Sequence, residues 1–287
     1  MAIKVVTDST SYIPVKLREQ FDISMVSLSV HFENESFLED QIDNEVFYKK
    51  MAASANIPTS SQPSPQDLYD TFEKHILQKN AVVGVFLSSD MSGTYSTAQM
   101  AKKQLLEKYP EAEIELVDSR SNSMQLGFAA LAAAKAAKKG LPMGQVLNSA
   151  KKVIENSRFL FVPETLTYLK KGGRIGGAAA LLGSILQIRP ILTVTDGKTA
   201  LVDKVRTQSR AIQNILNIFY QDVKQKGLGE VVVHHINNEA EGNRIAREIE
   251  QHLGISVDVF SIGPVIGLHV GPGTVGIVYY TDISKTF

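Results

Sequence analysis

The sequence predicts an α/β protein of two domains, an N-terminal doubly wound, mostly parallel sheet followed by a C-terminal mixed-sheet α/β domain. Two patterns predict this class. In the first half, short runs rich in Val, Ile, Leu and Phe alternate with longer helical patterns, which is the order of a parallel sheet with helical crossovers. In the second half, an Asp-Gly pair separates two strand-like runs, as in an antiparallel hairpin. A chain of 287 residues is also long enough for two domains of ordinary size.

The first half contains clear signals for strands and for helix ends. Strands are expected at residues 3–7, 24–32, 81–87 and 114–117. Ser64 can cap a helix that has Pro65 at its first position, and Pro14 can begin an earlier helix in the same way. Gly140 is expected to end an Ala-rich helix over 124–139.

The second half begins with a new strand at Phe159, so we predict an N-terminal domain over 1–158 and a C-terminal domain over 159–287. The hairpin turn is expected at Asp196-Gly197. The other elements expected here are strands at 159–162, 191–195, 199–205, 230–236, 257–262 and 275–281, and a helix at 239–253.

Composition excludes several classes of function. Lys plus Arg and Asp plus Glu both total 30, so no overall charge attracts nucleic acid or an anionic membrane. The chain has no cysteine, which excludes disulfides and thiolate zinc sites. The N-terminus enters a strand-like run without the pattern of a signal peptide, and the longest apolar run, 178–186, is far shorter than the ~20 residues that span a bilayer. We therefore expect a cytoplasmic protein without a membrane span or a nucleic-acid partner.

Hydroxyl-rich clusters follow three of the predicted strands, at 7–10, 88–94 and 118–119. The carboxyl ends of parallel strands share one edge, where such folds bind ligands, so these clusters should converge. Ser92-Gly93-Thr94 is also expected to open a helix, whose free N–H groups and dipole favour a carboxylate or phosphate. Any one cluster alone is more simply explained as a helix cap. Their shared edge favours the functional interpretation.

Two further polar segments are candidates for function. Pro58 to Pro65 contains three successive hydroxyls, including Thr59 and Ser60, held between prolines as a stiff array of donors, although the same residues would suit an ordinary loop. Residues 170–177 form a basic, glycine-rich turn that lacks the ending of a P-loop. This turn is either a close-packed corner or a surface where Arg174 meets a ligand or partner.

The glycines at 271–276 have the spacing of a dinucleotide-binding fingerprint, but they lead into a strand-like run where the fingerprint requires a helix. We therefore reject nucleotide binding there. His269 lies just before them, and a lone histidine among apolar residues is usually part of a core. The six histidines have no ligand-like spacing, so no metal site is expected, and the Gly-x-Ser-x-Gly motif of hydrolases is absent from the sequence.

Taken together, these segments resemble the DegV family, the fatty-acid-binding proteins that serve as carrier subunits of bacterial fatty acid kinase. The resemblance covers nearly the whole chain, through Val6-Thr-Asp-Ser-Thr10, Thr59-Ser-Ser-Gln-Pro-Ser64, the run from Leu87 to Thr97, Lys171-Gly-Gly-Arg174 and His269-Val-Gly-Pro-Gly-Thr274. Many members of the family have Thr where this chain has Ser60, a difference that keeps the hydroxyl.

The resemblance implies that the chain binds one long-chain fatty acid, such as palmitate, with its tail in an apolar tunnel. The implied ligands of the carboxylate are Thr59, Ser60, Ser92, Gly93, Thr94 and His269. Arg174 is implied at the head group or at the contact with a separate ATP-binding kinase subunit, which would phosphorylate the carboxylate. The chain itself is then a lipid-binding protein and not an enzyme, without catalytic residues, cofactor or metal.

In such a ligand the tail supplies the affinity and the carboxylate head group supplies the orientation. Burying roughly 15 methylenes at ~0.8 kcal/mol each gives about 12 kcal/mol before the costs of association. We expect the tail in the first domain and the carboxylate at the cleft between the domains, with residues 268–273 folded into a tight turn that brings His269 to it.

Two alternatives remain on the sequence alone. Ser92 could be the nucleophile of a hydrolase or transferase with His269 as its base. The same helix N-terminus could instead hold the phosphate of a nucleotide or another small molecule.

Overall fold

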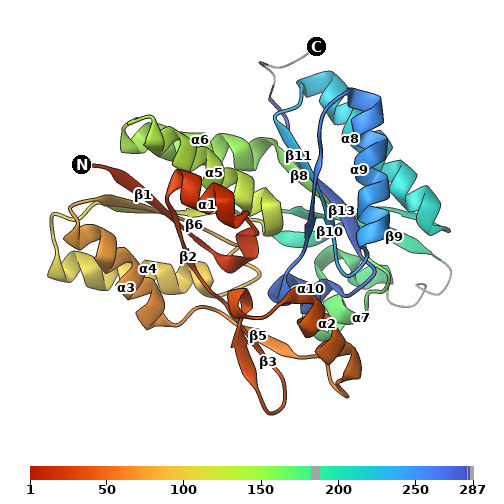
Figure 1. Cartoon of the computed structure of the whole chain (residues 1–287), viewed down its shortest axis with the longest axis horizontal. Helices are drawn as coiled ribbons and strands as arrows, with labels where there is room; N and C mark the ends of the chain where they lie inside the picture. Colours follow the sequence, from red (N-terminus) through yellow and green to blue (C-terminus); the bar gives the residue numbers. More distant parts are fainter. Residues whose placement is uncertain (182–187, 283, 285–287) are drawn as a thin grey trace. The chain divides into compact units, whose positions relative to one another are not determined.

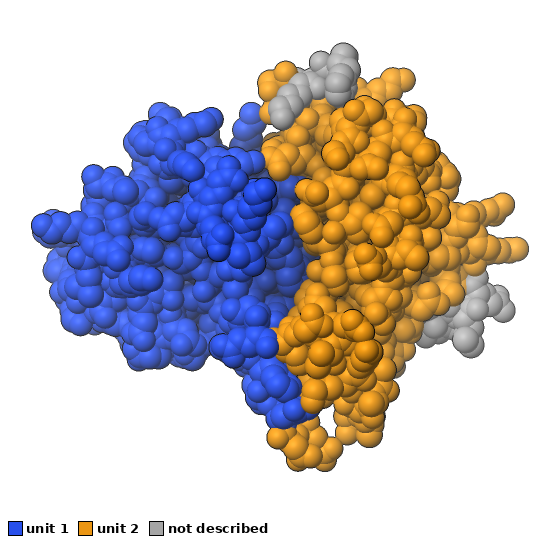
Figure 2. Space-filling model, viewed as in Figure 1, with its two compact units in different colours: residues 1–31, 35–41, 60–155 blue, residues 32–34, 42–59, 156–287 orange. Residues whose placement is uncertain are grey.

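The computed structural model describes residues 1–181, 188–282 and 284, and the chain divides into two compact units (Figures 1 and 2). Unit 1 comprises Met1–His31, Glu35–Gln41 and Ser60–Glu155, and unit 2 comprises Phe32–Asn34, Ile42–Thr59 and Asn156–Phe287. This division differs from the predicted continuous first domain over 1–158, because two segments from the first sixty residues group with unit 2.

Unit 1 is built on a parallel four-stranded sheet with the order β2-β1-β6-β7. Its strands are β1 (Ile3–Asp8), β2 (Ile23–Val26), β6 (Ala81–Phe86) and β7 (Ile114–Asp118). Every residue of β6 is buried, which explains why this central strand is a continuous apolar run without alternation. The parallel sheet predicted for the first half is confirmed.

Helices cover both faces of this sheet (Figure 1). One face carries α3 (Pro65–Leu77) and α4 (Thr94–Lys108), which enclose a core that includes Phe72, Phe86 and Leu105. The other face carries α1 (Val15–Phe21) and α5 (Ser123–Lys138), followed by α6 (Met143–Asn156). Five of the twelve buried residues of α5 are alanines, and these small side chains allow the helix to lie close to the sheet.

The apolar run at 24–32, predicted as one strand, is two strands in two sheets. After β2 the chain leaves the parallel sheet, and β3 (Ser29–His31) pairs with β4 (Ser36–Leu38) in a three-stranded sheet of order β4-β3-β5, where β5 is Thr59–Ser61. The break is at Leu28, whose N–H donates to Ser9 Oγ at 3.1 Å and whose carbonyl accepts from Glu39 N at 2.8 Å. Ser9 lies in η1 (Ser9–Ser11) and Glu39 in η2 (Glu39–Gln41), so contacts distant in sequence cause the break.

Unit 2 contains a six-stranded sheet with the order β10-β9-β8-β13-β11-β12. Its strands are β8 (Ser157–Val162), β9 (Arg189–Thr195), β10 (Lys198–Val205), β11 (Glu230–His235), β12 (Asp258–Ser261) and β13 (Val275–Tyr280). Only the β11–β12 pair is parallel among the strand pairs of this sheet in the described residues. The predicted mixed sheet of the second half is therefore confirmed.

The helices α8 (Gln208–Lys226) and α9 (Glu239–Leu253) pack on this sheet through an apolar core that includes Phe219, Ile249 and Tyr279. Three shorter helices belong to the same unit: α2 (Asn44–Ala53), α7 (Thr167–Lys171) and α10 (Pro264–Val270), with α10 in contact with both others. Across residues 1–181, 188–282 and 284, no helix is both long and apolar enough to cross a bilayer.

Of the turns and helix starts predicted from local sequence, two are confirmed and one is displaced by a residue. Asp196 and Gly197 have φ values of 50° and 78°, so the predicted hairpin turn is confirmed. Ser64 Oγ accepts from Asp67 N at 3.0 Å with Pro65 at the start of α3, as expected. Pro14 instead occupies the N-cap position, and α1 begins one residue later.

The Ala-rich helix ends at Lys138, and Gly140 follows with a φ of 73°, in agreement with its predicted role. The apolar segment after the glycine-rich turn begins as η3 (Gly176–Leu181), a 3₁₀ helix. The remainder of the 178–186 run lies outside the described residues.

Candidate functional site

The loops that follow β1, β6 and β7 meet at the carboxyl edge of the parallel sheet. Asp8 Oδ2 accepts from Leu87 N at 2.8 Å, which joins the loop after β1 to the loop after β6. Asp118 Oδ2 accepts from Ser89 Oγ at 2.6 Å, which joins the loop after β6 to the end of β7. The prediction that these polar clusters converge is confirmed.

Asp8 connects the loop after β1 to the loop after β6 through its carboxylate. It is completely buried and also accepts from Thr10 N at 3.0 Å and Thr10 Oγ1 at 2.5 Å. Burial raises the pKa of Asp8 to about 6, against the opposing effect of the hydrogen bonds from Thr10 and Leu87. The carboxylate is therefore used in holding two loops together.

The N-terminus of α4 forms a polar turn at this edge. Gly93 is the N-cap residue, so Ser92-Gly93-Thr94 opens this helix as the sequence predicted, and no acidic side chain lies in the first helical turn. Ser92 Oγ accepts from Thr94 N at 3.3 Å and lies 2.9 Å from Thr94 Oγ1. Ser92 is half-buried, Thr94 is buried and Gly93 is exposed. A carboxylate can be bound here by hydroxyl and backbone N–H donors at the positive end of the helix dipole.

The segment that carries Ser60 reaches the same turn. Gln62 Nε2 donates to Thr97 Oγ1 at 2.5 Å, and its Oε1 lies 1.9 Å from the place that a Cβ on Gly93 would occupy. Ser60 is two residues before Gln62, so their Cα atoms are at most roughly 7 Å apart. The structure therefore brings the β5 segment, with half-buried Ser60 and exposed Thr59, to the start of α4.

His269 and Arg174 are neighbours within unit 2. Arg174 Nη1 donates to Gly172 O at 2.7 Å, and a Cβ on Gly172 would lie 2.2 Å from His269 Nδ1. Burial, and then the charge of Arg174, lower the pKa of His269 to about 4. At neutral pH His269 is therefore an uncharged hydrogen-bonding group, while the side chain of Arg174 is exposed.

His269 lies in the last turn of α10, so the tight turn expected over 268–273 is confined to Pro272 and Gly273, after the helix has ended. Tyr48 OH donates to Ile262 O at 2.8 Å, and a Cβ on Gly267 would lie 2.0 Å from that hydroxyl. Gly271 has a φ of 94°, and a Cβ on this residue would lie 2.2 Å from the ring of Tyr168. These glycines therefore permit the close approach of α10 to α2 and α7.

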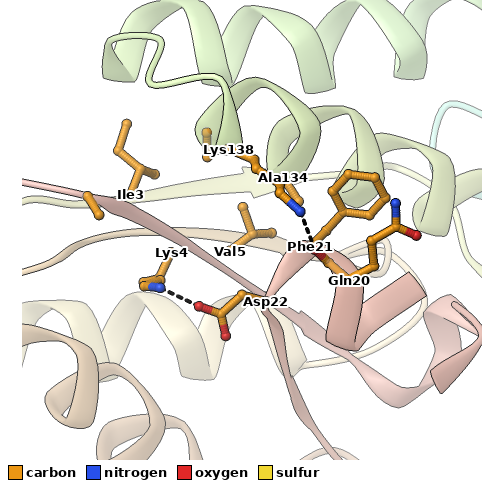
Figure 3. A pocket seen from close by; sticks show the side chains of 10 residues that line it. Ile3, Lys4, Val5, Gln20, Phe21, Asp22, Ala134 and Lys138 are labelled. Carbon is orange, nitrogen blue, oxygen red and sulfur yellow. Dashed lines mark hydrogen bonds and ion pairs between the residues drawn. The ribbon is translucent and has the colours of Figure 1, made fainter. Parts of the chain in front are cut away.

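A surface hollow of about 360 Å³ lies at the opposite end of β1 (Figure 3). Its residues include an ion pair between Lys4 and Asp22, and Lys138 Nζ donates to the carbonyl of Gln20 at 2.8 Å. Because it is lined by the first residues of β1, this hollow is separate from the polar edge described above.

Two contributors to the site were not identified from the sequence. The first is Gln62, whose place in the Thr-Ser-Ser-Gln-Pro run was noted without a role for its side chain. The second is Arg120. Its side-chain Nη1 lies 2.5 Å from Asp90 Oδ2, and its backbone N–H donates to Asp118 Oδ1 at 2.9 Å. No cluster of three potential metal-binding side chains occurs in the part of the chain that the structure describes.

The parallel sheet of unit 1 with its polar carboxyl edge, together with the mixed sheet of unit 2, defines a two-domain α/β protein. A family model described as an uncharacterised protein of the DegV family matches residues 2–282, so the chain belongs to the DegV family. A DegV domain-containing protein of Clostridium acetobutylicum is 51% identical over 282 residues, covering 98% of this chain and 99% of the relative.

Solved structures agree with this assignment over the full length. DegV of Bacillus subtilis, described as a fatty acid binding protein, aligns with a TM-score of 0.86 at 33% identity, covering 98% of this chain and 100% of that one. A stearic acid-binding protein of Eubacterium ventriosum aligns with a TM-score of 0.90 at 27% identity, covering 98% and 99%. The predicted family and fold class are thereby confirmed, and both of these proteins with the same fold are described as binding fatty acids.

Proposed function

We propose that this chain binds one long-chain fatty acid, with its carboxylate at the N-terminus of α4. The observation that carries the proposal is the Ser92-Gly93-Thr94 turn, with Gly93 exposed and Ser92 half-buried, which the Ser60 segment reaches through Gln62. The full-length similarity to proteins described as fatty acid binding supports the choice of a fatty acid over other anions.

The chemistry of the head group suits these residues. An ionised carboxylate removed from water requires several hydrogen-bond donors, and hydrogen bonds to a charged acceptor are stronger than neutral ones. Thr59, Ser60, Ser92 and Thr94 supply hydroxyls, while the backbone at Gly93 leaves the helix start open. We include neutral His269 as a further ligand, which would donate one N–H to the carboxylate.

The carrier role is the second part of the proposal. The bound acid is presented to a separate ATP-binding kinase subunit, which forms the acyl phosphate, and the exposed guanidinium of Arg174 lies at the contact or at the head group. In this scheme the chain is a lipid-binding protein of the cytoplasm that positions a substrate, and the tail occupies an apolar tunnel in unit 1.

Mass spectrometry of the protein purified from cells tests the function. Native spectra should show one added mass that organic extraction identifies as a C14–C18 fatty acid. A covalent adduct on Ser92 would favour the hydrolase or transferase alternative, in which His269 is the base. A bound nucleotide would favour the phosphate-binding alternative, and either result would contradict the carrier.

A further inference from the structure

Gln62 connects the end of β5 to the first turn of α4 through both ends of its carboxamide. The nitrogen donates to the buried hydroxyl of Thr97 at 2.5 Å. The oxygen lies over Gly93, in the space that a Cβ on this residue would fill. Thr97 N in turn donates to Gly93 O at 2.9 Å, so the carboxamide lies across one closed turn of the helix.

The backbone beside Gln62 is also constrained. Pro63 is buried and has a fixed φ, and a residue before proline is restricted to extended conformations. Ser64 then caps α3 through its hydrogen bond from Asp67 N. Gln62 is therefore held on one side by α4 and on the other by the start of α3, and Ser60 is only two residues away.

We propose that Gln62 is a positioning residue that sets the separation between Ser60 and Ser92 and thereby the preference for a carboxylate head group. This inference rests on the function proposed above. A carboxylate has two charged oxygens and needs donors from both segments at once, whereas an alcohol presents one neutral oxygen. Because functional groups must be held within about 0.5 Å of their productive geometry, a loosened β5 segment affects the acid far more than the alcohol.

The chain offers a matched control for this role. Gln62 and Gln66 are both exposed glutamines, and Gln66 Nε2 donates to Asp70 Oδ1 at 2.7 Å on the surface of α3. Replacing either with alanine removes the same group and one hydrogen bond. Only Gln62 touches the first turn of α4, so only its replacement should change head-group selectivity.

The experiment compares the Kd of palmitate with that of hexadecanol, each measured by displacement of a fluorescent fatty acid. We expect Gln62→Ala to raise the Kd of palmitate about tenfold, as for the loss of a hydrogen bond to a charged group, and that of hexadecanol less than twofold. Gln66→Ala should change neither value. Thr97→Val removes the acceptor of the Gln62 amide and should reproduce the change in the ratio, whereas Thr97→Ser, which keeps the hydroxyl, should restore it.

Other outcomes separate this inference from the function on which it rests. An equal loss for acid and alcohol in Gln62→Ala would mean that Gln62 only supports the fold, and an unchanged ratio would mean that it has no effect on the head group. Either result overturns the positioning role while the wild type still prefers palmitate. A wild-type protein that binds hexadecanol as tightly as palmitate would contradict the carboxylate site itself.

Discussion

Ser92 retains hydrogen-bonding capacity after its internal contacts are counted. A serine hydroxyl has one donor and two acceptor sites. Ser92 Oγ accepts from Thr94 N and can accept from Thr94 Oγ1 as well, which leaves its own O–H available. In this arrangement the Ser92 hydroxyl can donate its proton to a ligand of the proposed site.

Removing these hydroxyls should weaken acid binding without unfolding the protein. Ser60→Ala and Ser92→Ala are each expected to cost ~1.5–3 kcal/mol of binding, or roughly a 10- to 150-fold rise in Kd, because each deletes a donor to a charged acceptor. Isothermal titration with palmitate checks the size of the effect, and thermal unfolding checks the fold. Ser149→Ala, at a half-buried serine of α6 whose hydroxyl donates to the carbonyl of Gln145, is the control and should bind as the wild type does. An unchanged affinity of the Ser60/Ser92 double variant would exclude this site.

His234 gives unit 2 a defined dependence on pH. It is completely buried, and its Nδ1 lies 3.1 Å from the carbonyl of Phe260, so the neutral ring donates from Nδ1. Burial lowers the pKa of His234 from 6.5 to about 4. Because the folded-state pKa is the lower one, the associated stability is present above pH 6.5 and is lost as pH falls towards 4, by up to about 3 kcal/mol.

Urea unfolding between pH 7 and pH 4 measures this loss. His234→Asn keeps a donor for Phe260 O and removes the titration, so its stability should fall less steeply with acid than that of the wild type. The raised pKa of Asp8 acts in the opposite direction, since its contribution is lost as pH rises through about 6. Asp8 is common to both proteins and cancels in the difference. Parallel pH profiles would show that His234 does not titrate as proposed.

At the scale of elements, the sequence predicted what local patterns determine. The Ser92-Gly93-Thr94 turn and the helix after it follow from a hydroxyl, a glycine and a run of helix formers within one segment. The contact of Gln62 with Gly93 joins two segments, and no local pattern specifies it. Likewise, the strand predicted at 24–32 is interrupted by partners of Leu28 that come from η1 and η2.

The helix α10 is a second element whose form is not evident from its local sequence. It has seven residues, contains Gly267 and ends before Gly271, so its sequence favours a turn. It also contacts α2, where Tyr48 OH donates to the carbonyls of Ile262 and Gly263 at 2.8 and 3.3 Å. These carbonyls lie at the start of the helix, so we expect Tyr48 to stabilise the beginning of α10.

Removing the Tyr48 hydroxyl should therefore destabilise unit 2. Tyr48→Phe removes this buried hydrogen bond, although the Ile262 carbonyl keeps a longer one from Asn44 Nδ2 at 3.4 Å, and is expected to lower the free energy of unfolding by about 1 kcal/mol. Tyr69→Phe removes a hydroxyl that is 3.2 Å from Glu73 on the half-buried surface of α3 and should cost less. Chemical denaturation of both variants measures the difference. Equal stability of the two would mean that α10 does not depend on the Tyr48 hydroxyl.

At the scale of the whole molecule, alternating strand and helix signals predicted the parallel sheet, and the Asp196-Gly197 hairpin signal predicted antiparallel pairing in the second sheet. They could not show that Phe32–Asn34 and Ile42–Thr59 group with unit 2, because this grouping depends on contacts such as that of Asn44 Nδ2 with Ser261 Oγ at 3.1 Å, between residues distant in sequence. The position of the acyl tail is a question of the same kind, since it depends on which unit supplies the apolar interior.

We expect the tail in unit 1. The proposed head-group residues Ser60 and Ser92 both belong to this unit, and each precedes a helix that packs on the parallel sheet. A tail that leaves the carboxylate in the direction of this core gains about 0.8 kcal/mol for each methylene buried between helices and sheet.

Photolabelling tests this placement without altering the protein. A fatty acid with a diazirine at its methyl end should label peptides of unit 1, within 1–31, 35–41 or 60–155, and a diazirine next to the carboxylate should label the loops that carry Ser60 and Ser92. Excess palmitate should suppress both labels, because all three ligands compete for one site. Methyl-end label recovered in peptides from 156–282 would place the tail in unit 2 and contradict the arrangement, even if the carboxyl-end label stayed beside Ser92.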